Sequence, residues 1–93
     1  MFIRGLSLQV KGNRRDRIVI FSALLACAIG GTKKTEMMYR AGLSTAQLRK
    51  YMDVLMESEL LEALRQKKAV VYRTTVKGKR FLEEFNVLVK LLN

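Results

Sequence analysis

Residues 33–59 read KKTEMMYRAGLSTAQLRKYMDVLMESE and predict two helices joined by a tight turn. The first helix is expected over 33–41, and Gly42 follows it as a residue that readily takes a positive φ. Ser44 and Gln47 then match a capping box, in which a serine at the N-cap and a glutamine three residues later satisfy each other's backbone N–H groups. The chain is therefore expected to resume as a helix a few residues after it stops.

The second of these helices has one apolar side. Leu48, Met52 and Leu55 recur at helical spacing, and the helix is expected to end near Glu59. With that stripe facing the core, the opposite side of the helix presents Gln47, Lys50 and Asp53. Thr45 and Arg49 lie toward the edges of this polar side.

The longest apolar run lies upstream, at 18–29, and is interrupted by Ser22. A helix needs about 20 apolar residues to span a bilayer, so this run predicts a buried core helix. Asp16 is expected to cap this helix or to lie in its first turn, and Gly30-Gly31 is expected to end it. Thr32 is then expected to cap the helix at 33–41. Cys27 lies inside this run and is expected to be a packed, unreactive thiol.

Downstream, the apolar pattern changes its period. Residues 60–65 and 69–74 predict two short strands, joined by a polar tip at 66–68. Thr75 is expected to cap a last helix over 76–92, in which Gly78 is an unusual first-turn residue. The first thirteen residues are expected to form an arm, as an extra edge strand or frayed.

Composition excludes several classes of protein. The chain has 93 residues and suits a single small domain, with 14–75 as its body and 76–93 as a helix of the same domain. It has no His and one Cys, which excludes an internal disulfide, a Cys/His metal site and His-dependent catalysis. We therefore predict a protein that is not an enzyme and needs no cofactor. No signal peptide is recognised, so the expected compartment is the cytoplasm.

The net charge of +10 is unevenly distributed. Residues 18–32 carry no charge, whereas residues 65–80 hold seven Lys or Arg and no acid. Basic blocks also lie at 1–17 and 33–50. Such clustering predicts a polyanionic partner.

The predicted order is helix, helix, turn, helix, hairpin, helix, and a basic hairpin after a helix-turn-helix unit is a wing. The chain resembles archaeal winged helix-turn-helix proteins of the 10a type over residues 14–93. The resemblance is carried by the helix ending in Gly30-Gly31, by the segments at 34–41, 42–51, 57–61 and 71–78, and by Phe81-Leu82. It implies an α+β, mainly α fold with three helices, a wing and a C-terminal dimerisation helix. It also implies binding of double-stranded DNA as a homodimer. Glu59 stands where the family usually has Gly, and the final helix is short.

The candidate DNA-binding residues follow from this arrangement. Gln47 can bond an adenine edge, and Arg49 or Lys50 can reach guanine or phosphate. In the simpler alternative, Gln47 only closes the capping box and the two basic residues form a solvated face. The full candidate set is Lys33, Lys34, Thr35, Ser44, Thr45, Gln47, Arg49, Lys50, Arg65, Lys67, Lys68 and Arg73.

The last helix is more apolar than packing on one small core requires. Its candidate dimer contacts are Phe81, Phe85, Leu88, Val89 and Leu92. The surplus predicts a homodimer, with the N-terminal segment covering this surface as the alternative.

We therefore expect a double-stranded DNA-binding protein, acting as a dimeric transcriptional regulator or nucleoid-associated chromatin component. A winged-helix module for protein interaction or RNA binding is the alternative, because fold alone does not decide function. Neither a membrane partner nor a small-molecule effector is indicated by the sequence.

Overall fold

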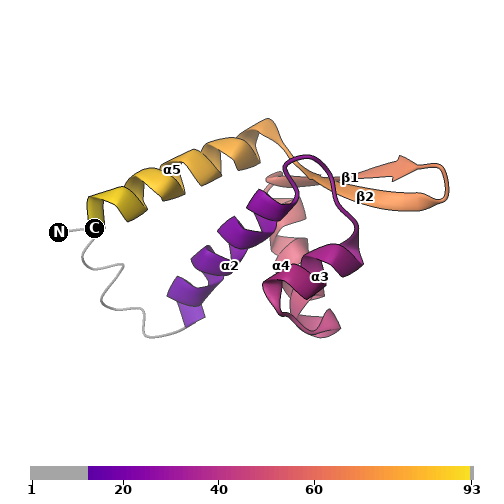
Figure 1. Ribbon diagram of the computed structural model, residues 1–93, viewed down its shortest axis with the longest axis horizontal. Helices are drawn as coiled ribbons and strands as arrows, with labels where there is room; N and C mark the ends of the chain where they lie inside the picture. The colour runs from indigo at the N-terminus through magenta and orange to yellow at the C-terminus, as the bar shows by residue number, and fades with distance from the viewer. Residues whose placement is uncertain (1–12, 93) are drawn as a thin grey trace.

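The structure is a computed structural model and describes residues 13–92 (Figure 1). The predicted arm at 1–13 therefore lies almost wholly outside the described residues. The elements, in chain order, are α2 (Asn13–Cys27), α3 (Lys34–Ala41), α4 (Thr45–Glu57), β1 (Leu61–Gln66), β2 (Ala69–Thr74) and α5 (Val76–Leu92). This order confirms the predicted fold class. Figure 1 shows the hairpin projecting from one end of the molecule and α5 running toward the other.

The core joins α2, α3, α4 and the start of β1. Its buried apolar side chains come from all four elements: Leu24, Leu25, Ala28, Met37, Leu48, Met52, Leu55 and Leu61. The rings of Phe21 and Tyr51 meet edge to face, with centroids 5.8 Å apart, and so join α2 to α4. The predicted stripe of α4 is therefore the side that faces the core, and Cys27 is partly buried against it.

The end of α2 differs from the prediction. The helix stops at Cys27 because the next backbone groups bond to β2 instead of continuing the helix. The Ala28 carbonyl accepts from the Thr74 N–H at 2.9 Å. Thr32 exchanges two backbone hydrogen bonds with Tyr72, at 2.9 and 2.8 Å, and so adds an antiparallel bridge to the hairpin.

The predicted cap at Thr32 is therefore wrong. The N-cap of α3 is Lys33, which makes no side-chain capping bond. Threonine is a residue type that can cap a helix, but Thr32 lies one position before the N-cap of α3. Its backbone is hydrogen-bonded to Tyr72 of β2.

The turn between α3 and α4 is as predicted. Gly42 ends α3 in the left-handed conformation, with φ 67°, and the Leu43 N–H donates to the Met38 carbonyl. The capping box is complete, since the Ser44 hydroxyl accepts from the Gln47 N–H at 3.2 Å and the Gln47 Oε1 accepts from the Ser44 N–H at 3.0 Å.

The end of α4 is closed by the residue that departs from the family pattern. Glu59 takes φ 63°, the left-handed conformation that glycine adopts without cost. The N–H groups of Glu59 and Leu60 donate to the carbonyls of Met56 and Leu55, which is a Schellman ending. The wing therefore follows α4 as it would after a glycine.

The hairpin is tighter than predicted. Gln66 pairs with Ala69, so the loop consists of two residues, Lys67 and Lys68, where three were expected. Lys67 has φ 55°, a conformation that two-residue hairpin loops require and glycine usually supplies.

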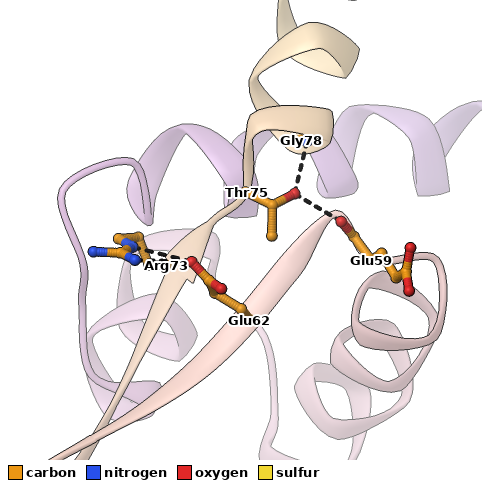
Figure 2. A network of polar contacts seen from close by, with 5 residues as sticks. All are labelled: Glu59, Glu62, Arg73, Thr75 and Gly78. Carbon is orange, nitrogen blue, oxygen red and sulfur yellow. Dashed lines mark hydrogen bonds and ion pairs between the residues drawn. The ribbon is translucent and has the colours of Figure 1, made fainter.

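A polar junction joins the end of α4 to the start of α5 (Figure 2). The Thr75 hydroxyl donates to the Glu59 carbonyl at 2.7 Å and accepts from the Gly78 N–H at 3.0 Å, which confirms Thr75 as a cap. A Cβ on Gly78 would clash with the Leu60 carbonyl oxygen and lie 2.6 Å from the Thr74 Cγ2. Gly78 is therefore the residue that lets α5 cross the base of the hairpin.

Candidate nucleic-acid interface

The N-terminal half of α4 presents a polar surface. Thr45, Gln47, Arg49 and Lys50 are exposed, on the side away from the buried stripe. Gln47 uses one acceptor position of Oε1 in the capping box, which orients its side chain and leaves the Nε2 group free to donate. Gln47 can therefore close the capping box through Oε1 and at the same time donate to a base through Nε2, because the two roles use different atoms.

The start of α3 adds exposed positive charge. Lys33, Lys34 and Thr35 are all exposed in the first turn, where unpaired backbone N–H groups favour an anion. The bridge between Thr32 and Tyr72 ties this turn to β2, so the helix start and the wing are held as one unit.

The wing carries four of the predicted residues, and they are not equivalent. Arg65, Lys67 and Lys68 are exposed and make no ion pair within the described part of the chain. Arg73 instead faces its cross-strand partner Glu62, whose Oε2 accepts from Nε at 3.1 Å and from Nη2 at 3.0 Å (Figure 2). The expectation of a wing without an offsetting acid is wrong at Arg73, because pairing brings Glu62 from outside the basic block.

Two residues with distinctive surroundings were not predicted from the sequence. Tyr39 on α3 is 86% exposed, a large value for an aromatic residue. Tyr39 lies four residues after the candidate Thr35, so both lie on one side of α3, and this spacing could have identified Tyr39 from the sequence. Lys77 also went unnoticed, and its Nζ donates to the Ser58 carbonyl at 2.8 Å, which braces the end of α4.

The predicted dimer residues divide into two groups along α5. Phe81 and Phe85 are half-buried, with Phe81 packed against the core. Leu88, Val89 and Leu92 are 40%, 37% and 64% exposed. The outer half of α5 thus shows the apolar surplus that the sequence predicted.

Over residues 13–92, no helix is both long enough and apolar enough to cross a membrane. In the same part of the chain, His, Cys, Asp and Glu side chains form no group of three able to hold a metal ion.

A short helix, a Gly turn, a capped helix with an exposed polar face and a basic hairpin define a winged helix-turn-helix domain. The family model described as winged helix-turn-helix matches residues 14–93, and the chain belongs to that family. A search of curated proteins finds no match.

Among solved structures, the chain is similar to Sso10a-2, a DNA-binding protein from Sulfolobus solfataricus, with a TM-score of 0.66 and 24% identity over 81% of this chain and 78% of that one. It is also similar to MarR from E. coli, with a TM-score of 0.68 and 17% identity over 94% of this chain and 62% of that one. ZitR from Lactococcus lactis in complex with DNA gives a TM-score of 0.62 and 21% identity over 80% and 51%. The resemblance to 10a-type proteins is thus confirmed for the fold, and the chain spans about half to two thirds of the two bacterial regulators.

Proposed function

We propose that this protein binds double-stranded DNA as a homodimer and acts as a non-enzymatic transcriptional regulator or nucleoid-associated chromatin component. The observation that carries the proposal is the exposure of all twelve candidate residues at the start of α3, the start of α4 and the wing. The buried apolar side chains lie on the opposite side of α4. A positively charged surface of this kind suits a phosphate backbone.

In the proposed complex α4 enters the major groove. Recognition helices read base edges with their N-terminal residues, and here those residues include Gln47, Arg49 and Lys50. The wing then lies along the backbone, where Lys67 and Lys68 contact phosphates. The printed descriptions of Sso10a-2 as DNA-binding and of ZitR in complex with DNA support this by analogy.

The wing offers a test of backbone contact. The double variant Lys67→Gly and Lys68→Ala removes two charges, and glycine suits the positive φ at the first position. We expect weaker binding to all duplexes alike and a log–log salt slope shallower by about 0.9 for each lost phosphate contact. Fluorescence anisotropy with two unrelated duplexes measures both effects, and weakening confined to one duplex would refute the wing assignment.

Glu62 should limit how strongly Arg73 contacts DNA. Glu62→Gln breaks the ion pair, so we expect tighter binding and a slope steeper by about 0.9, the value for one added phosphate contact. Because the pair is exposed, stability should change by less than about 1 kcal/mol.

Glu36→Gln is the matched control, because it makes the same charge change and breaks the exposed pair with Arg40 on α3. Equal salt slopes for the two variants would mean that only net charge matters. Weaker binding by Glu62→Gln would mean that the ion pair orients Arg73 toward DNA.

The homodimer is proposed to form through the outer half of α5. A C2 dimer would bury the exposed Leu88 and Leu92 against the same residues of a second copy and would present two α4 helices to successive turns of DNA. Leu88→Lys should shift sedimentation from dimer to monomer, whereas Val76→Lys at the other end of α5 should not. A monomeric unsubstituted protein at micromolar concentration would contradict this proposal.

A further inference from the structure

Helices α2 and α5 form an open apolar groove that the proposed DNA contacts do not use. Its volume is about 620 Å³. The main lining residues are Val19, Ala23 and Ala26 of α2, Ile29 just after it, and Leu82 and Phe85 of α5. Val19 is 50% exposed and Ile29 is 46% exposed, so large apolar side chains face solvent along this wall.

Among the lining residues of α2, the side-chain polar atom is already hydrogen-bonded. Ser22 is the hydroxyl residue of the α2 wall, and its Oγ donates to the carbonyls of Ile18 and Val19 at 3.0 and 2.9 Å. The other polar lining residues, Lys79, Glu83 and Asn86, all belong to α5, so the exposed apolar α2 wall indicates an apolar occupant.

We propose that residues 1–12 of the same chain occupy this groove. The segment is joined directly to α2, one wall of the groove, at Asn13. Ala26, the last of these lining residues within α2, lies about 20 Å from Asn13 at 1.5 Å per residue. Twelve residues span about 18 Å as a helix and about 40 Å when extended, so the segment reaches most or all of the groove in either conformation. The covalent link also raises its local concentration to about the millimolar range.

The chemistry of the segment matches the groove. It contains Phe2, Ile3, Leu6, Leu8 and Val10 and no acidic residue. Its two positive charges, Arg4 and Lys11, suit the rim of α5, where Glu83 and Glu84 are exposed. Neither acid is ion-paired within residues 17–92, although Lys79 lies on the same rim as Glu83.

This occupant divides the apolar surface of α5 between two roles. Leu82 and Phe85 would pack on the chain's own N-terminal segment, whereas Leu88, Leu91 and Leu92 beyond the groove would stay available to a second copy. The inference does not rest on DNA binding, since it concerns a different face of the molecule.

Photo-cross-linking of the full chain tests the proposal. p-Benzoylphenylalanine placed at Phe2, and in a second variant at Leu6, should cross-link within one chain to residues 19–29 or 79–86, as mapped by mass spectrometry. The same probe at Lys68 in the wing is the control and should give no product in those ranges. Cross-links scattered over the whole surface would overturn the proposal, and products of dimer mass mapped to the groove would assign it to the second copy's segment.

A charge placed in the groove provides a second readout. Ala23→Glu should abolish the groove cross-links, whereas Ala46→Glu on the exposed start of α4 should leave them unchanged. Because both alanines are exposed, circular dichroism should show a folded protein in each case. Undiminished cross-linking in Ala23→Glu would contradict the assignment.

Discussion

Gly78→Ala should lower the free energy of unfolding by about 3 kcal/mol, the upper part of the usual range for forcing an extra methyl into packed structure. The new Cβ would clash with the Leu60 carbonyl oxygen, a backbone atom held at the base of the hairpin, and with the Thr74 Cγ2. The Leu60 carbonyl and Thr74 are both held at the hairpin, so α5 must shift as a whole to relieve the clash. For a domain of this size the melting temperature should fall by roughly 12–24 °C, measured by circular dichroism.

Glu59→Gly is the matched control for that experiment, because it changes the same junction in the opposite direction. Its φ of 63° suits glycine, so the variant should be more stable by up to about 1 kcal/mol. The bond from Thr75 to the Glu59 carbonyl is a backbone contact and is retained. A Gly78→Ala variant as stable as the unsubstituted protein would show that the crossing of α5 over β1 is looser than described.

The double variant Arg49→Ala and Lys50→Ala should weaken duplex binding about 100-fold, which corresponds to about 3 kcal/mol if the two residues make base or phosphate contacts. Both side chains are exposed on α4 and contribute nothing to the buried stripe, so stability should change little. Anisotropy titration at fixed salt measures the loss.

Arg80→Ala and Lys90→Ala together form the control, because they remove the same two charges from exposed positions on α5. We expect that pair to weaken binding only slightly. Equal losses in the two double variants would mean that binding follows net charge and not the recognition helix.

Local signals explain why much of this fold was predictable. The Ser44–Gln47 capping box, the Gly42 turn and the α4 stripe each depend on residues within a few positions of one another, and each is observed. The change in period predicts the hairpin, and the predicted strands at 60–65 and 69–74 agree with β1 and β2 to within one residue.

The errors come from contacts between distant parts of the chain. The sequence predicts a cap at Thr32, but the backbone groups of Thr32 bond to Tyr72, forty positions away. The charge of Arg73 is offset by Glu62 only because the strands pair in that register. From the sequence, Gly78 is only a residue that weakens a helix. In the structure, the Leu60 carbonyl occupies the space that a side chain at position 78 would need. The candidate DNA-binding residues are all exposed, as expected, but their contacts with DNA remain a prediction.

The most direct test of DNA binding is an anisotropy titration of a labelled duplex with the full chain at several salt concentrations. We predict binding at about 50 mM salt, with an affinity that falls linearly on log–log axes by about 0.9 per neutralised phosphate. No binding at about 50 mM salt, or an affinity unchanged by salt, would contradict a phosphate-binding wing and recognition helix.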